Sequence, residues 1–165
     1  MKAIVVYESH WGNTAAIAKA IAEGIGATTQ VLSTAEAIPS ALAGVGLIVA
    51  GAPLLGFSLP TESMVGSLAS NQAGAPKAAD ISHPPMRSWL ANLPKGGGRV
   101  AGFETAIWWS PGSSAKSIIK LAGQKGYAAA AKGQRFIVQG RYGPLKAGEL
   151  ERAKLWGAEL AKSLS

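Results

Sequence analysis

Continuous apolar runs recur along the chain and alternate with segments of helical spacing. The run Ala3–Tyr7 contains three β-branched residues and is followed by the polar pair Glu8 and Ser9. Such a run is typical of a strand in a sheet that helices cover on both faces. Comparable runs predict four further strands, over Thr29–Leu32, Gly46–Ala50, Val100–Phe103 and Arg135–Gln139.

Between these runs, apolar residues recur at the period of an amphipathic helix. Ile17, Ile21 and Ile25 follow each other every four residues, and their stripe ends near Gly24 and Gly26. Similar patterns predict a weak helix over Ala35–Ala43, a helix over Ala115–Ala122 and a last helix over Leu150–Leu164.

The alternation of strands and helices with short connections predicts the architecture. Each crossover between parallel strands is right-handed and places its helix on a face of the sheet. We therefore expect one doubly wound α/β domain over residues 1–165, with helices on both faces. One insertion, at about 71–93, interrupts it. The insertion begins with a segment rich in Ala, Gly and Pro, and Met86, Trp89, Leu90 and Leu93 then predict a small helix that docks Trp89.

Composition excludes several classes of protein. The chain has 165 residues, of which 48% are hydrophobic, so it can bury a sizeable core. It has no cysteine and only two histidines, which excludes disulfide frameworks, thiol chemistry and zinc clusters built on cysteine.

Charge is distributed unevenly along the chain. Residues 1–76 contain two basic and four acidic side chains, whereas residues 77–165 contain fourteen basic and five acidic ones. The basic residues of the second part stand singly rather than in runs, which is typical of a solvated surface. An acidic protein partner or a phosphate-bearing ligand would also fit this balance, and nucleic acid is the weakest of the readings because it would rest on charge alone.

Two segments bear on location. The N-terminal apolar run is too short for the core of a signal peptide, so we expect a cytoplasmic protein. The uncharged stretch between Glu36 and Glu62 is long enough to cross a bilayer, but its prolines and glycines break any single helix repeatedly. We therefore expect no membrane span.

The loop after the first predicted strand, the phosphate loop (residues 9–14), carries the clearest chemical signal. Its donors are the hydroxyls of Ser9 and Thr14, the Asn13 amide and the backbone N–H groups around Gly12. They precede a predicted helix, whose N-terminus favours an anion. An ordinary turn in which Asn13 only caps the helix is the alternative interpretation.

The spacing in and around this loop resembles the flavodoxin family. The family pattern places an aromatic residue, a Ser or Thr, a Gly, a Thr, an Ala and an aliphatic residue at fixed intervals, and here these are Tyr7, Ser9, Gly12, Thr14, Ala18 and Ile21. The resemblance covers nearly the whole chain. It implies a flavodoxin-like fold with a five-stranded parallel sheet in the order 2-1-3-4-5, and FMN as the cofactor, with its phosphate in the phosphate loop.

The resemblance also assigns two further loops to the flavin ring. The second loop (residues 51–60) would offer Pro53 and apolar contacts from Leu54, Leu55 and Phe57, while Gly56, which has no Cβ, would let a peptide turn over. An ordinary loop glycine is the alternative for Gly56.

The third loop (residues 103–114) would contribute Glu104, Thr105 and Gly112, but it lacks the family's glycine-rich stretch with a stacking tyrosine and has Trp108 and Trp109 instead. One of the two indoles could stack on the flavin while the other packs or faces solvent. Alternatively, both serve the core or a partner.

Two residues of the phosphate loop depart from its small polar character. Trp11 could reach the edge of the flavin ring. His10 is expected to face solvent and to contribute only its backbone N–H, although a histidine beside a phosphate could add positive charge below neutral pH.

These features favour an FMN-binding one-electron carrier between redox partners, in which the protein does no bond chemistry itself. An NAD(P)H-dependent quinone or flavin reductase on the same fold is the alternative. A flavin-free binding module is the third possibility, and it rests on the unusual residues of the second and third loops.

Overall fold

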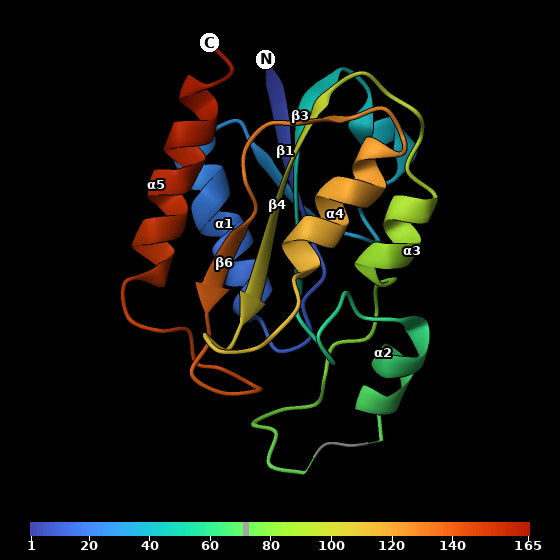
Figure 1. Ribbon diagram of the computed structural model, residues 1–165, viewed down its shortest axis with the longest axis vertical. Coiled ribbons are helices and arrows are strands. Elements are labelled where there is room, and N and C mark those ends of the chain that lie inside the picture. The colour runs from blue at the N-terminus through green and yellow to red at the C-terminus, as the bar shows by residue number, and fades with distance from the viewer. Residues whose placement is uncertain (71–72) are drawn as a thin grey trace.

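The computed structural model describes residues 1–70 and 73–165, and its centre is a parallel β-sheet (Figure 1). The strand order is β2-β1-β3-β4-β5, and β6 also pairs with β4. The strands are β1 (Lys2–Tyr7), β2 (Gln30–Ser33), β3 (Val45–Pro53), β4 (Arg99–Ala106), β5 (Ala128–Ala129) and β6 (Gln134–Ile137).

The fold agrees with the expected order 2-1-3-4-5, except that its fifth strand is divided in two. Ala128 of β5 lies opposite Arg99, at the start of β4, whereas Gln134 of β6 lies opposite Phe103, in the second half of β4. The sequence predicts only the β6 part. Two alanines carry no pattern that distinguishes β5 from a loop.

Helices cover both faces of the sheet (Figure 1). On one face, α1 (Asn13–Ile25) and α5 (Glu149–Lys162) pack over a core that includes Val5, Phe103 and Phe136. On the other face, α3 (Met86–Ala91) and α4 (Ser114–Gly123) pack over Ile4, Val6 and Ile48 among others. Successive residues of β1 point to opposite faces of the sheet, and helices cover both faces. The alternate residues of its apolar run are therefore buried on either side, as the continuous run predicts.

Two glycines let α1 and α5 approach each other closely. A Cβ at Gly24 would lie 1.9 Å from the Lys154 carbonyl oxygen, and one at Gly157 would lie 2.2 Å from that of Ile21. Any larger residue at either position would push the two helices apart.

The expected helix over Ala35–Ala43 is wrong. Only the 3₁₀ turn η1 (Pro39–Leu42) forms there. A proline disfavours helical geometry at the residue before it, and Ile38 is accordingly extended. Conversely, α2 (Glu62–Leu68) is not among the expected helices, although Thr61 caps it by accepting a hydrogen bond from the Met64 N–H at 3.2 Å.

The segment expected as an insertion, about 71–93, contacts the rest of the fold through its described residues, and residues 71 and 72, including the predicted start at Asn71, lie outside the described residues. The predicted small helix is confirmed as α3. Trp89 is buried, and its indole N–H donates to the Ala37 carbonyl oxygen at 2.8 Å. Trp156 of α5 is likewise buried in the core.

The carboxyl ends of β1, β3, β4 and β6 point to the same end of the molecule, where α2 and the beginning of the described part of the insertion lie (Figure 1). In the part of the chain that the structure describes, no helix is both long and apolar enough to cross a membrane.

Candidate functional site

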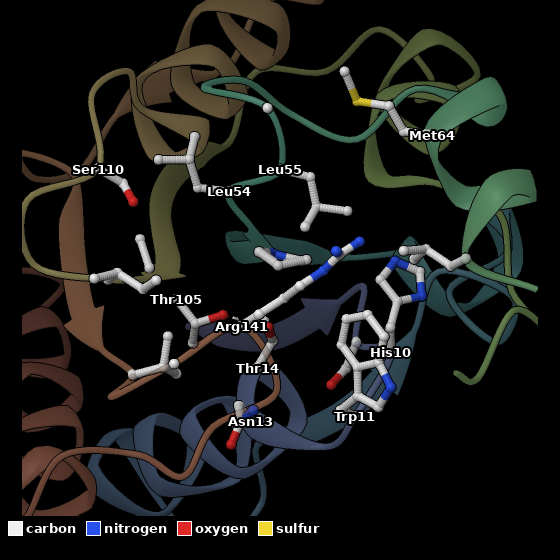
Figure 2. A pocket seen from close by; sticks show the side chains of 18 of the residues that line it. His10, Trp11, Asn13, Thr14, Leu54, Leu55, Met64, Thr105, Ser110 and Arg141 are labelled. Carbon is white, nitrogen blue, oxygen red and sulfur yellow. Dashed lines mark hydrogen bonds between the residues drawn. The ribbon is translucent and has the colours of Figure 1, made fainter. Parts of the chain in front are cut away.

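A pocket of about 390 Å³ opens at the carboxyl ends of the strands (Figure 2). Its lining combines the phosphate loop, the second and third loops, α2 and the loop between β6 and α5. The lining residues include Ser9, His10, Trp11, Asn13, Thr14, Pro53, Leu54, Leu55, Gly56, Met64, Ser67, Thr105, Ile107, Ser110 and Arg141. Parallel α/β sheets bind their ligands at this position, beyond the carboxyl ends of the strands.

The phosphate loop turns sharply into α1. Gly12 has a φ of 95°, which is the left-handed region that glycine adopts without strain, and its N–H donates to Ser9 Oγ at 3.2 Å. Helix α1 begins at Asn13, and the N–H groups of its first turn have no acceptor within the helix. These donors and the dipole of the helix make its N-terminus favourable for an anion.

Asn13 does not cap α1 through its side chain. Gly12 occupies the cap position, and Asn13 Nδ2 donates instead to the Tyr142 carbonyl oxygen at 3.0 Å. Thr14 Oγ1 lies 2.7 Å from Thr105 Oγ1, which connects the phosphate loop to the third loop. The alternative of a plain capping turn is therefore wrong for Asn13.

The second loop forms one wall of the pocket. Pro53, Leu54, Leu55 and Gly56 line it, while Phe57 lies outside with 63% of its surface exposed. Leu55 and Ser58 exchange two backbone hydrogen bonds of 3.1 Å around Gly56 and Phe57, whose φ angles are 54° and 70°. Gly56 therefore sits in a turn that requires left-handed backbone, and Phe57 adopts that conformation against its steric preference.

The third loop reaches the pocket with Thr105, Ile107 and Ser110, and not with its tryptophans. Trp108 is 74% exposed and Trp109 is 61% exposed, and neither lines the pocket. Neither indole packs in the core, so the alternative that both tryptophans serve the core is wrong. Glu104 and Gly112 also lie outside the lining.

A single guanidinium holds the third loop in place. Arg135 of β6 pairs with the buried Glu104 at 2.8 Å, and its Nη1 and Nη2 donate to the carbonyl oxygens of Ser110 at 2.7 Å and Gly112 at 2.8 Å. Glu104 also accepts from Ser113 Oγ and from the Ala115 N–H. Glu104 therefore organises the loop and the start of α4 from within the protein.

His10 is buried, with 3% of its surface exposed, so the expectation that it faces solvent is wrong. Its Nδ1 lies 2.7 Å from the Asp80 carbonyl oxygen, and its Nε2 lies 2.7 Å from Glu8 Oε2. A carbonyl oxygen only accepts, so Nδ1 carries a proton. A hydrogen bond between Nε2 and the Glu8 carboxyl group requires a second proton, and the other oxygen of Glu8 accepts from the Met86 N–H.

The insertion supplies the partners that bury His10. The ring of His83 stacks on that of His10, with centroids 5.5 Å apart, and His83 Nε2 accepts the Ser9 N–H. Burial would lower the pKa of His10, but the hydrogen bonds to Glu8 and Asp80 outweigh it and raise that pKa above its ordinary value. Burial lowers the pKa of His83 despite the nearby Asp80. We therefore assign the charge of this pair to His10.

Two basic residues at the site were not singled out from the sequence. Arg141 follows β6 and lines the pocket, and Lys77 of the insertion lies beside Gly12, with Nζ 3.8 Å from where a Cβ would stand. Both are isolated basic residues in loops, and no local pattern distinguishes them from solvated surface charges. Helix α2 contributes Met64 and Ser67 to the pocket lining. Thr61 at its cap and Glu62 in its first turn are a local signal from which this helix could have been predicted.

The chain shares this architecture with solved flavodoxins. A flavodoxin from the domain Archaea has a TM-score of 0.69 and 22% sequence identity, over 99% of each chain. Oxidised Flavodoxin 1 from Bacillus cereus has a TM-score of 0.68 and 19% identity over the full length of both chains. A flavodoxin, WrbA-like protein from Agrobacterium tumefaciens has a TM-score of 0.57 and 22% identity, over 98% of this chain and 95% of that one.

No protein-family model and no curated protein matches the chain. The strand order and these structures define a flavodoxin-like fold, which confirms the fold expected from the phosphate loop.

Proposed function

We propose that the protein binds FMN and acts as a one-electron carrier between redox partners. The observation that carries the proposal is the composition of the pocket. An anion-binding helix N-terminus stands at one end of it, and apolar side chains from the second loop and α2 stand at the other. A flavin mononucleotide has matching ends, a phosphate and a largely apolar ring system.

The residues at the phosphate end fit a phosphate monoester. The hydroxyl of Ser9 and the N–H groups at the start of α1 are donors, and Thr14 lies in the first turn of that helix. No Asp or Glu stands among the described residues that line the pocket, so no carboxylate would repel the anion.

The residues at the ring end fit a flat apolar group. Leu54, Leu55 and Met64 would contact the ring system, while Pro53 and Ile107 would exclude water from its sides. The exposed Phe57, Trp108 and Trp109 would stand at the outer rim, where an incoming partner meets the cofactor. Glu104 and Gly112 would act on the cofactor indirectly, by fixing the shape of the third loop.

When bound, FMN supplies the redox chemistry, because its ring system accepts and releases electrons singly. The residues of the chain bind the cofactor, orient it and restrict its contact with water.

An acidic partner is part of this proposal. Residues 99–146 hold eight basic side chains against Glu104 alone, and the rest of the chain is balanced at eight of each sign. The cytoplasmic location stays a prediction.

An NAD(P)H-dependent quinone or flavin reductase is the second candidate. The exposed aromatic residues at the rim favour it, because a planar substrate could stack on them. Steady-state oxidation of NADPH by the FMN-loaded protein with a benzoquinone distinguishes the two. Sustained turnover would support the reductase, and its absence would support the carrier.

Titration of the cofactor-free protein with FMN tests the binding proposal. We expect quenching of flavin fluorescence and a perturbed visible spectrum. Thr14→Val removes one hydroxyl at the phosphate end and should weaken FMN binding by about tenfold, as loss of a hydrogen bond to a charged group does. Thr28→Val, at an exposed position remote from the pocket, is the matched control. Failure of the unmodified protein to bind FMN would reject the flavoprotein proposal.

A further inference from the structure

Only two ionisable side chains stand among the described residues that line the pocket, and both are basic. They are His10 and Arg141. When His10 is protonated, its charge is compensated locally, because its Nε2 lies 2.7 Å from the carboxylate of Glu8, which is completely buried. Arg141 has no such compensation. Within the described residues no carboxylate pairs with its guanidinium, so the uncompensated charge of the pocket belongs to Arg141.

The guanidinium of Arg141 extends into the pocket rather than away from it. Figure 2 shows its side chain crossing between Leu55 and His10, beside the phosphate loop. Its Cζ lies over the Tyr142 ring, 5.7 Å from the ring centroid, which is a cation–π contact between these two neighbouring side chains. A guanidinium in this position presents several N–H donors to whatever occupies the space between the second loop and α1.

The backbone that carries Arg141 is attached to the phosphate loop. The carbonyl oxygen of the next residue, Tyr142, accepts from Asn13 Nδ2 at 3.0 Å, and the Tyr142 ring packs edge-on against Trp11 with centroids 4.7 Å apart. The Tyr142 hydroxyl donates to the Ala73 carbonyl oxygen at 3.2 Å, which ties in the insertion. These contacts fix the position of the Arg141 backbone relative to the start of α1.

A buried donor close to Arg141 also lacks a partner. The indole Nε1 of Trp11 is inaccessible to solvent and has no hydrogen-bond acceptor among the described residues. Lys77 adds a second positive charge beside Gly12, outside the pocket lining. Arg141 and Lys77 therefore place two cations beside the phosphate loop, and no carboxylate stands among the described residues of the pocket lining.

We propose that Arg141 is the anion-recognising residue of this pocket, where its guanidinium binds a phosphate monoester held at the first turn of α1 and Lys77 adds to the attraction from outside. The planar guanidinium offers two parallel N–H donors to a phosphate, and this pairing is stronger and more directional than a neutral hydrogen bond. The inference rests on the proposed function for the identity of the ligand, FMN, and it adds that Arg141 makes the protein select FMN over riboflavin.

The test compares Arg141→Gln with the unmodified protein. Lys132→Gln is the matched control, because it removes the same charge from a residue outside this pocket. The dissociation constants of FMN and of riboflavin are measured by flavin fluorescence for each protein. Independently, inorganic phosphate is titrated into ¹⁵N-labelled protein while the Arg141 Nε–H and Trp11 Nε1–H signals are followed by NMR.

We expect Arg141→Gln to weaken FMN by about tenfold or more and to leave riboflavin within about twofold, as the loss of a charge-assisted pair predicts. Arg141→Lys should recover part of the loss, because it keeps the charge but not the paired donors. Lys77→Gln should weaken FMN by less than Arg141→Gln does, because Lys77 stands outside the pocket lining. Lys132→Gln should change neither flavin.

Three outcomes would overturn the inference. FMN and riboflavin could weaken equally, FMN affinity could stay unchanged, or phosphate could bind equally well to Arg141→Gln. Phosphate binding that depends on Arg141 in a protein that binds no FMN would instead uphold the anion site and reject the proposed function. An unchanged ¹H–¹⁵N spectrum outside the pocket confirms that the variant is folded.

Discussion

The backbone N–H of Ser9 donates to Nε2 of His83 at 3.0 Å, although the two residues are 74 positions apart. One belongs to the phosphate loop and the other to the insertion. The same segment of the insertion exchanges hydrogen bonds with His10, whose Nδ1 and carbonyl oxygen pair with the backbone of Asp80. The insertion is therefore a structural support of the phosphate loop.

This contact predicts opposite titrations for the two histidines. The pKa of His10 should lie above about 6.5 because Glu8 and Asp80 stabilise its protonated form, and that of His83 should lie below about 6.5 because it is buried. Since the chain has only two histidines, their imidazole NMR signals can be assigned with His83→Gln alone. Observation of the reverse order would contradict the assignment of the charge to His10.

The raised pKa of His10 also predicts how stability depends on pH. Protonation of His10 is favoured in the folded state, so its contribution is fully present below the unfolded value of about 6.5 and is lost as pH rises through the folded pKa. Urea unfolding from pH 6 to pH 9 measures it, and Glu8→Gln should flatten the decline. His83 acts in the opposite sense, because its lowered pKa removes stability as pH falls below about 6.5. An unchanged slope in Glu8→Gln would sink the prediction.

Arg135 is predicted to determine the order of the third loop. Arg135→Gln would leave the buried Glu104 without its cation and the carbonyl oxygens of Ser110 and Gly112 without their donor. Removing one partner of a buried pair costs about 3 kcal/mol of unfolding free energy, and we expect a loss of that order. Hydrogen exchange at Trp108 and Trp109 should accelerate as well. Lys132→Gln serves again as the control, and equal stability of the two variants would refute this role.

Close contact between the second and third loops is predicted to depend on Gly112. Its φ is 89°, and a Cβ there would lie 1.9 Å from the Phe57 carbonyl oxygen. Gly112→Ala should therefore lower the unfolding free energy by about 1–3 kcal/mol and displace the turn at Gly56 and Phe57. Gly123→Ala, where a Cβ meets nothing within 4 Å, should be neutral or stabilising by up to about 1 kcal/mol. Comparable losses of unfolding free energy in both variants would show that the close contact at Gly112 does not cause the loss.

The concentration of positive charge in residues 99–146 predicts how salt affects electron transfer. The reduced FMN-loaded protein should transfer electrons to an acidic acceptor of higher potential, such as cytochrome b5, more slowly as ionic strength rises. Transfer to the basic acceptor cytochrome c should accelerate instead, because salt screens the repulsion. Stopped-flow measurement of the electron-transfer rates from 20 to 500 mM salt tests this prediction. Rates that do not depend on salt with either acceptor would reject the proposal of an acidic partner.

Features that short segments encode can be predicted from the amino-acid sequence alone. The apolar run of β1, the isoleucine stripe of α1 and the spacing of Ser9, Gly12 and Thr14 are local patterns, and each predicts its element without knowledge of the rest of the chain. The alternation of such elements restricts the fold further, because parallel strands need helical crossovers of one hand.

The surroundings of the phosphate loop, in contrast, depend on tertiary contacts. His10 is buried by Asp80, 70 residues away, and Asn13 binds Tyr142, 129 residues away. Arg141 lines the pocket and Lys77 lies beside Gly12, while Trp108 and Trp109 are exposed outside the pocket lining on a loop that Arg135 holds. The surroundings of a loop side chain depend on which distant segments pack against it. That choice is made by the free energy of the whole fold and leaves no periodic signal in the sequence.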